Sequence, residues 1–195
     1  MIVVGIDPAS NGAACIIKDQ EAKIVFEWKC RNRKKGKVYV VSISNLNKDE
    51  IDIVECKSGA DIGSQIGAYL VLLKEEDEEF YLCSEDAYVG TNKHTAIIVA
   101  KFAGMIVGSV HNYTRCLNRV LWVQPNKWRH ELIKVPYFTK REKVKKYSLD
   151  LVPKKIPTIS NHINKLGVYD HITDSAGVGM WAWNSLTIYK TTTKK

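Results

Sequence analysis

Two short apolar runs joined by a turn open the chain, where residues 2–18 read IVVGIDPASNGAACIIK. The runs 2–6 and 13–18 have the length and the apolar content of buried β-strands. Between them, Asp7 to Gly12 has the composition of a turn, with proline, serine, asparagine and glycine. The sequence therefore predicts that the chain begins with a sheet and that Asp7 lies where the first strand ends.

Strand signals continue further along the chain. In residues 24–30, apolar side chains alternate with mostly polar ones, which is the period of a half-buried strand. The other expected strands are rich in apolar or β-branched residues and cover 38–43, 80–83 and 120–123. Between the strands at 24–30 and 38–43 we expect a basic loop, 31–37.

Helical periodicity indicates where helices pack against this sheet. Apolar side chains recur at three- and four-residue spacing in residues 62–73, and similar patterns predict helices over 93–111 and 169–183. Pro125 is well placed to begin a short helix. Residues 152–164 contain two prolines and are predicted to form a loop. This order of elements predicts an α/β fold, in which helices flank a mixed β-sheet of about five strands.

The length and composition are those of an ordinary globular protein. With 195 residues, of which 45% are hydrophobic and 26% charged, the chain is neither a disordered tail nor a collagen-like repeat. It has no internal repeat and no dividing linker, so we expect residues 1–195 to form a single domain. Five cysteines without a CxxC pair imply neither a disulfide framework nor a zinc site. The start lacks a signal peptide and no apolar run reaches about 18 residues, so we expect a cytoplasmic protein outside the membrane.

The chain is basic. It has 29 Lys and Arg against 21 Asp and Glu, a formal net charge of +8. The excess is concentrated in the loop 31–37 and in residues 127–155. A positive excess favours a polyanionic partner, with nucleic acid ahead of a membrane surface, although many basic proteins bind neither.

Three acidic residues stand where a predicted strand ends or a predicted helix begins: Asp7, Glu85 and Asp174, with His171 one helical turn before Asp174. If they meet at one edge of the sheet, their charges repel unless protons or cations neutralise them. Mg²⁺ suits such a cluster because it binds oxygen ligands, and two ions roughly 4 Å apart could activate a water and stabilise the leaving oxygen of a phosphodiester. The structural alternatives are a hydrogen-bonding turn residue at Asp7, an exposed strand end at Glu85 and a favourable helix-dipole charge at Asp174.

Three motifs in order resemble those of the RuvC-type Holliday junction resolvases, members of the ribonuclease H-like superfamily. Residues 6–12, IDPASNG, resemble their opening strand and turn, and residues 85–104 resemble their second acidic motif. Residues 171–176, HITDSA, resemble their closing Asp-x-x-Asp-Ala helix, with Ser175 in place of the usual Ala. The resemblance implies a ribonuclease H-like fold and a RuvC-like nuclease domain, and the divergent, lysine-rich loops suit a phage or other viral member acting in the host cytoplasm.

Carried over to this sequence, the resemblance makes Asp7, Glu85 and Asp174 catalytic, metal-binding carboxylates. His171 takes the fourth acidic position, as it does in some members of the family, and would complete the catalytic and metal site. Imidazole there removes one negative charge from a crowded site and adds a group that titrates near neutral pH. The alternative is that His171 only caps or packs its helix. The cofactor implied is Mg²⁺, with two ions per site and Mn²⁺ as a substitute.

The resemblance also implies how DNA is held. Tyr88 would lie beside the cleft and stack on bases or wedge between them at a branch point, and Asn92 would bind the backbone nearby; a plain surface tyrosine is the alternative for Tyr88. Basic side chains expected to contact phosphates, unless they only form solvated faces, are Arg31, Arg33, Lys34, Lys35, Lys140 and Arg141. We expect Trp122 and Trp128 to pack in the core rather than to stack on bases.

The helix 93–111 carries two apolar stripes, which suggests burial on more than one side. One stripe contains Ile97, Ala100, Gly104 and Gly108, and two glycines one turn apart usually mark a close backbone contact. In the resembled family the equivalent helix helps to form a two-fold dimer, so we expect a homodimer; burial wholly within one chain is the alternative.

These observations favour a Mg²⁺-dependent endodeoxyribonuclease that resolves four-way junctions and other branched DNA by paired phosphodiester hydrolysis, in DNA recombination, repair or replication. The alternatives are an RNA-processing nuclease of the same superfamily and a non-catalytic DNA-binding module.

Overall fold

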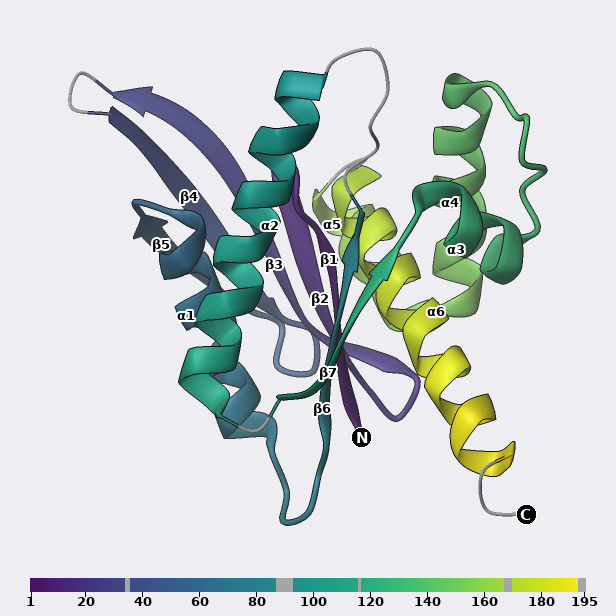
Figure 1. The fold of residues 1–195 in the computed structure, drawn as a ribbon, viewed down its shortest axis with the longest axis horizontal. Helices are drawn as coiled ribbons and strands as arrows, with labels where there is room; N and C mark the ends of the chain where they lie inside the picture. The colour runs from purple at the N-terminus through teal and green to yellow at the C-terminus, as the bar shows by residue number, and fades with distance from the viewer. Residues whose placement is uncertain (34–35, 87–92, 116, 167–169, 193–195) are drawn as a thin grey trace.

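The structure of the chain, a computed structural model, describes residues 1–33, 36–86, 93–115, 117–166 and 170–192. At 117–119, 141, 161 and 163–166 it describes the backbone alone. Within these residues, a seven-stranded sheet is covered by helices on its two faces (Figure 1). The strands are β1 (Ile2–Asp7), β2 (Gly12–Lys18), β3 (Glu21–Arg33), β4 (Gly36–Asn45), β5 (Glu50–Cys56), β6 (Phe80–Glu85) and β7 (Leu117–Val123). The helices are α1 (Gly59–Leu73), α2 (Lys93–Thr114), α3 (Pro125–Ile133), α4 (Arg141–Lys155), α5 (Pro157–Leu166) and α6 (Asp170–Thr192).

The sheet is mixed, with strand order β5-β4-β3-β2-β1-β6-β7. The first five strands form an antiparallel meander, because each pairs with the next along the chain. After the crossover through α1, β6 lies parallel to β1, and after the crossover through α2, β7 lies parallel to β6. The carboxyl ends of β1 and β6 therefore lie side by side at one edge of the sheet.

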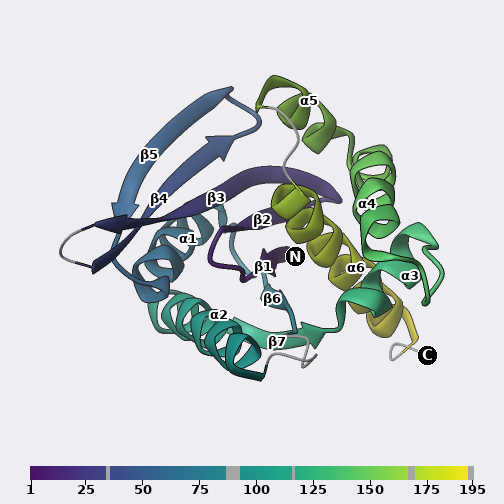
Figure 2. The same cartoon turned by 90° about the horizontal axis from the view of Figure 1, so that it is seen from above.

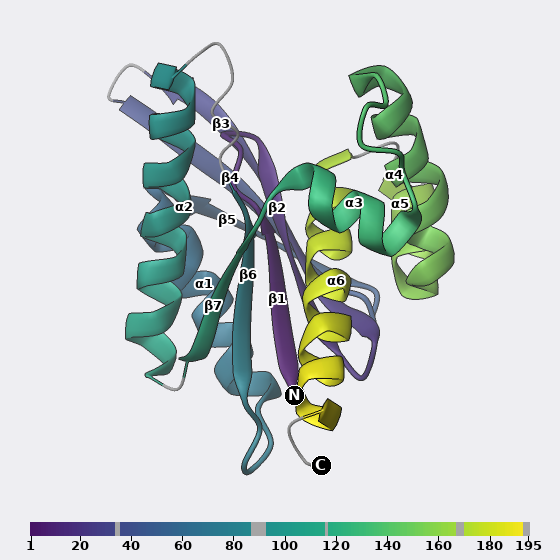
Figure 3. The ribbon, with the colours of Figure 1, turned by 45° about the vertical axis from the view of Figure 1, so that its right-hand side comes forward.

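The two faces of the sheet carry separate cores, because successive side chains of a strand point to opposite faces. In β1, Ile2, Val4 and Ile6 belong to the core under α1 and α2, whereas Val3 belongs to the core under the other helices. Helices α1 and α2 cover the first face, and α3 to α6 lie over the second (Figures 2 and 3). This arrangement confirms the predicted α/β class, with helices on both sides of a mixed sheet.

Helix α6 lies directly against β1. A Cβ atom added at Gly5 would lie 2.1 Å from the carbonyl oxygen of Ser175 and 2.3 Å from the amide nitrogen of Gly179. No residue other than glycine fits at this crossing without a backbone shift. The contact brings the first turns of α6 close to the end of β1, where Asp7 lies.

The sheet is larger than predicted, with seven strands rather than about five. The prediction omitted β5, although its sequence EIDIVEC alternates polar and apolar residues at 50–53; in this edge strand Ile51 and Ile53 are exposed, so the alternation does not mark a buried face. The expected basic loop 31–37 was also wrong in part, because Arg31 to Arg33 extend β3 and Gly36 begins β4. Long paired strands at this place form a projecting hairpin (Figure 1).

The predicted loop 152–164 was wrong as well, because most of it is helical. Pro153 lies inside the last turn of α4 and Pro157 begins α5. A proline is tolerated at the first turn of a helix, where its missing N–H has no partner to lose, so Pro157 is a start signal rather than a break. The predicted helix beginning at Pro125 is confirmed as α3.

Helix α2 packs along α1 and leaves a long stripe in contact with solvent. Ile97 is 53% exposed and Met105 is 43% exposed, and added Cβ atoms at Gly104 and Gly108 would meet nothing within 4 Å. Among the described residues, the predicted close contact at these glycines is therefore absent, and none of them buries this stripe. By length and composition alone, α2 is the one helix in the described part of the chain that could cross a membrane, although some of it is buried against the protein.

Candidate active site

Two carboxylates end neighbouring parallel strands on the face covered by α6. In the register of β1 and β6, Ile6 is paired with Ser84, so the next residues are Asp7 and Glu85. Asp7 follows Val3 by four residues along β1, and Glu85 follows Cys83 by two along β6. Val3 and Cys83 both lie in the core beneath α6, so the alternation of strand side chains directs both carboxylates to that face. Asp7 is only 7% exposed there.

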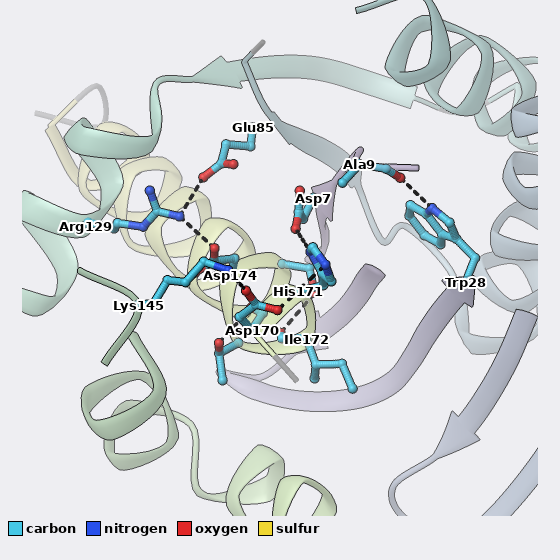
Figure 4. A network of polar contacts seen from close by, with 12 residues as sticks. Asp7, Ala9, Trp28, Glu85, Arg129, Lys145, Asp170, His171, Ile172 and Asp174 are labelled. Atoms are coloured by element: carbon cyan, nitrogen blue, oxygen red, sulfur yellow. Dashed lines mark hydrogen bonds and ion pairs between the residues drawn. The ribbon is translucent and has the colours of Figure 1, made fainter. Parts of the chain in front are cut away.

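The turn after Asp7 is anchored to β3. The indole Nε1 of Trp28 donates to the carbonyl oxygen of Ala9 at 2.8 Å (Figure 4). The amide of Cys30 donates to Oδ1 of Asn11 at 2.9 Å. Gly12 is required because an added Cβ would lie 2.4 Å from the carbonyl oxygen of Asp7. The asparagine and glycine of the first motif therefore hold the turn that fixes Asp7.

Helix α6 supplies the imidazole and the third carboxylate from its first turns. Nδ1 of His171 lies 2.6 Å from Oδ2 of Asp7, and its Nε2 lies 3.7 Å from Oδ1 of Asp170 (Figure 4). The hydrogen bond with Asp7 raises the pKa of His171, which favours the imidazolium form. Asp170 in turn pairs with Lys145 of α4.

Helix α3 supplies two further side chains that contact these carboxylates. Nε1 of Trp128 donates to Oε1 of Glu85 at 2.8 Å, and the buried indole packs against Gly177, where a Cβ would lie 2.4 Å from the ring. The guanidinium of Arg129 lies between two acids: its terminal nitrogen is 2.7 Å from Oδ2 of Asp174 and 3.3 Å from Oε1 of Glu85 (Figure 4). Arg129 thus neutralises part of a buried negative cluster.

Burial and mutual repulsion disfavour ionisation of the two carboxyls next to Arg129. Burial, followed by the charge of Asp7, raises the pKa of Glu85 to about 8. Burial also raises the pKa of Asp174 to about 6, against the opposing charge of Arg129. One guanidinium is therefore too little positive charge to ionise all the carboxyls fully at neutral pH.

The sequence matches no known family model and no curated protein sequence. The structure, in contrast, is similar to the RuvC structure of Thermus thermophilus, with a TM-score of 0.51 at 13% sequence identity over 96% of each chain. It is also similar to T. thermophilus RuvC in complex with a Holliday junction substrate, with a TM-score of 0.55 at 13% identity and the same coverage. The chain has the fold of the RuvC-type resolvases. A weaker likeness, with a TM-score of 0.44 and 19% identity, relates 98% of the chain to 82% of Ydc2, the yeast mitochondrial Holliday junction resolvase.

Within this RuvC-type fold, the four residues of the acidic motifs lie at one edge of the sheet. They form two contacting groups: Asp7 with His171, and Glu85 with Asp174 through Arg129. The three sequence motifs therefore predicted which side chains the fold brings together. Their roles in catalysis and in metal binding stay predictions.

The residues fit a divalent cation by donor type and by one unsatisfied carboxylate oxygen, Oδ1 of Asp174. Across the described residues, three buried side-chain polar atoms lack a hydrogen-bond partner: Arg129 Nε, Ser148 Oγ and Asp174 Oδ1. Arg129 Nε is a donor and cannot bind a cation, whereas the hydroxyl of Ser148 lies beside the carboxyl of Asp174 and lowers its pKa, although it lies outside strict hydrogen-bond geometry. Unpaired buried polar atoms are rare in folded proteins and mark places where an ion or water is expected. Among the side chains that the structure describes, however, no three acidic, histidine or cysteine residues surround one point, because Arg129 lies between Glu85 and Asp174.

The predicted DNA-contacting residues have different outcomes. Arg31 and Lys140 are exposed, whereas Arg33 is exposed but paired with Glu55 of β5. Outside the described residues or side chains lie Tyr88, Asn92, Lys34, Lys35 and the side chain of Arg141. Trp128 is fully buried, as predicted, but Trp122 is 48% exposed on the edge strand β7, so its expected place in the core was wrong.

Sequence reasoning missed Trp128 and Arg129 as members of the site. Both fall in the basic stretch 127–155, where a lysine or arginine is easily taken as part of a DNA-binding face. The available signal was their position one turn after Pro125, which begins a helix directly after a strand parallel to β6. Such a helix starts at the edge where the carboxylates lie.

Proposed function

We propose that this chain is a Mg²⁺-dependent endonuclease that resolves four-way DNA junctions and other branched DNA by hydrolysing phosphodiesters. The observation that carries the proposal is the cluster of Asp7, Glu85 and Asp174 at the carboxyl ends of β1 and β6, with Oδ1 of Asp174 left without a hydrogen-bond partner. The likeness to a RuvC structure solved with a Holliday junction substrate supports the choice of substrate.

In this proposal, Asp7, Glu85, Asp174 and His171 would hold the cation, with Mn²⁺ as a substitute for Mg²⁺. When bound, two such ions would supply Lewis-acid activation of a water and stabilisation of the leaving oxygen. Asp7 orients His171 through the 2.6 Å hydrogen bond, which favours a proton on the imidazole; His171 would have to release this proton before it could bind the cation. Exposed cations at the same edge, such as Arg31 and Lys140, would hold the DNA backbone.

Paired cutting across a symmetric junction requires two active sites, and we propose that residues 1–195 act as one nuclease domain within a homodimer. The exposed apolar stripe of α2 supports this assembly, because a monomer gains nothing from leaving Ile97, Ile98 and Met105 in water. On the same helix, Gly104 and Gly108 leave room for the backbone of a partner helix to approach.

The test compares cutting and binding by the wild-type chain and by Asp7→Asn. We expect the variant to bind a four-way junction as tightly as the wild type and to cut it at least about 100-fold more slowly in Mg²⁺, since the amide keeps the shape but loses the charge. Asp77→Asn, which makes the same change at an exposed position, serves as the control. Cutting by Asp7→Asn at the wild-type rate would contradict the proposal.

The same gel separates the alternatives when four substrates are compared with and without Mg²⁺: a four-way junction, a branched duplex, a linear duplex and an RNA–DNA hybrid. Preferred cutting of the hybrid would indicate an RNA-processing nuclease. Binding to the junction without any cutting in Mg²⁺ or Mn²⁺ would indicate a DNA-binding module.

A further inference from the structure

A short loop between α3 and α4 holds a phenylalanine ring entirely in water. Residues 134–140 read KVPYFTK, and Phe138 is 101% exposed, more than any other large hydrophobic side chain described. Tyr137 beside it is 50% exposed. A fully exposed aromatic ring contributes none of the stabilisation that burial would give, and here it stands beside a second exposed ring rather than alone.

Hydrogen bonds and ring stacking hold the conformation of the loop that carries this ring. Lys134 adopts a left-handed conformation with φ of 58°, and its amide donates to the carbonyl of His130 at 3.1 Å. The ring of Tyr137 stacks on that of His130 with 4.2 Å between centroids. The amide and the hydroxyl of Thr139 both donate to the carbonyl of Pro136, at 3.1 and 2.7 Å. Phe138 therefore lies within a closed turn, which reduces the conformational entropy that a bound state would lose.

The surroundings of the ring are positively charged. Lysine side chains at 134, 140, 143 and 146 are exposed on the loop and on the first turns of α4, whereas Glu142 is the one acid between 134 and 146. An apolar ring among cations is the reverse of a typical protein-binding patch, whose centre is depleted of charge. It fits a polyanion that also offers flat apolar faces, which is nucleic acid with an accessible base.

The loop joins the two helices that form one wall of the candidate active site. Helix α3 ends just before the loop and carries Trp128 and Arg129, which contact Glu85 and Asp174. Helix α4 begins just after the loop and carries Lys145, which pairs with Asp170, and Ser148. In Figures 1 and 3 the beginning of α4 lies at the same end of the molecule as the carboxyl ends of β1 and β6. DNA held over the carboxylates would pass near this loop.

We infer that Phe138 is a wedge that inserts against the open base pair at the branch point of the junction; this inference rests on the function proposed above. A continuous duplex has no free base face, whereas the strands of a branch diverge and leave a terminal base pair open to stacking. An inserted apolar side chain replaces the lost base stacking and holds the branch open. The flanking lysines would bind the phosphates on either side.

The experiment measures how Phe138→Ala changes binding to a four-way junction and to a linear duplex of the same length, in Ca²⁺ in place of Mg²⁺. We expect the ratio of junction affinity to duplex affinity to fall about 5- to 100-fold, as loss of one aromatic stacking contact predicts, with duplex binding unchanged. A 2-aminopurine base placed beside the branch should brighten on binding of the wild type and not of Phe138→Ala. Phe138→Trp should restore both signals.

The control is Ile188→Ala, which removes another exposed apolar side chain from the far end of α6. If the wild type prefers the junction and Phe138→Ala prefers it equally, with the same 2-aminopurine signal, the wedge is wrong and the proposed function stands. If the wild type has no preference for the junction, the proposed function fails and the wedge with it. If Phe138→Ala instead changes the oligomeric state in sedimentation, the ring contacts a second copy and the inference is overturned.

Discussion

Arg129 is the residue on which the electrostatics of the carboxylate cluster depend. Its guanidinium contacts both Asp174 and Glu85 at the position where a divalent cation would have to approach the same oxygens. The guanidinium and a metal ion therefore compete for one set of carboxylates. Arg129 lets the acidic cluster fold without a cation, since unpaired buried charges are strongly destabilising, and under the proposed function a bound cation would have to displace it.

Replacing Arg129 by glutamine should lower stability without metal and strengthen metal binding. Removal of one partner from a buried ion pair costs about 3–5 kcal/mol, and protonation of the carboxyls would lessen that cost. We expect thermal unfolding in EDTA to shift to lower temperature and added Mg²⁺ to raise it by more than in the wild type. Arg33→Gln, at the exposed pair with Glu55, is the matched control and should change neither value. Equal Mg²⁺ affinity of Arg129→Gln and wild type in calorimetry would contradict the competition.

The raised pKa of Glu85 predicts that the metal-free protein loses stability as pH rises. A carboxyl with a higher pKa in the folded state binds more protons when folded, so its contribution is present below about pH 4.5 and is lost as pH rises to about 8. The slope reaches roughly 1.4 kcal/mol per pH unit for one proton. In EDTA we expect Glu85→Gln to unfold at a higher temperature than the wild type at pH 8 and to show a flatter pH dependence. Glu76→Gln, at an exposed site, should follow the wild-type curve.

The residues of the site could be predicted from the sequence as far as short-range patterns reach. Asp7 and Glu85 each follow an apolar run, and Asp174 lies one turn after His171, so each position carried a local signal. Arg129 carried only a weak one, its position one turn after Pro125, and its residue type does not distinguish a buried cation from the exposed lysines of the same stretch. Its role depends on a contact across 45 residues of chain to Asp174, which only the tertiary structure provides.

At the scale of the element, the crossing of β1 and α6 determines the geometry of the site. Gly5 and Gly179 let the two backbones touch, and His171 and Asp174 lie on the turns of α6 just before this contact. The helix propensity of α6 alone would not select this crossing. Because the two backbones touch at this crossing, the carboxylate of Asp7 on β1 and that of Asp174 on α6 are held at a fixed distance from each other.

Gly5→Ala should destabilise the protein and move His171 and Asp174 of α6 away from Asp7 of β1. The added methyl group would lie 2.1 Å from the carbonyl oxygen of Ser175, so α6 must move away from β1. We expect a loss of about 3 kcal/mol in the free energy of unfolding, measured by urea denaturation, together with a large loss of cutting. Gly104→Ala, which adds the same group in open space on α2, should raise stability by about 1 kcal/mol at low protein concentration. Wild-type stability of Gly5→Ala would show that the crossing is looser than described.

The elements that sequence patterns predicted are those with a strong period or clear end signals. The strands β1 to β4, β6 and β7 each contain an apolar run or alternation, and α1, α2 and α6 each contain an apolar stripe. Strand β5 has only a short alternation at 50–53, and as an edge strand it leaves both of the isoleucines in it exposed. Residues 152–164 were misjudged because a proline is compatible with the first turn of a helix, which sequence alone does not locate.

At the scale of the whole molecule, the two faces of the sheet differ in the chemistry of the surface that covers them. The face under α3 to α6 carries the carboxylates, the loop 134–140 with its two aromatic rings, and most of the basic residues of 127–155. The face under α1 and α2 is covered by helices whose outer side is unexpectedly apolar, with Ile97, Ile98 and Met105 in contact with solvent. One face thus suits a polyanion and the other suits a second copy of the chain.

Ile97→Glu should convert the protein from a dimer to a monomer. The wild type at micromolar concentration should sediment at twice the mass of the chain, since a stable interface buries about 800 Å² on each partner and α2 offers an apolar strip of suitable length. A glutamate in the middle of that strip would place two charges near the two-fold axis without disturbing the core, because Ile97 is 53% exposed. The two like charges would repel each other, so Ile97→Glu should weaken the interface by more than the loss of buried apolar area alone.

Ile53→Glu introduces the same charge at an exposed isoleucine of the edge strand β5 and should leave the dimer intact. Sedimentation measures the assembly, and a junction labelled on two opposite strands reports whether both are cut in one binding event. The monomeric variant should nick single strands and release the junction, because each chain carries a complete carboxylate cluster. A wild-type chain that sediments as a monomer, or two variants that sediment alike, would contradict assembly through α2. Another surface would then have to bring two active sites together on one junction.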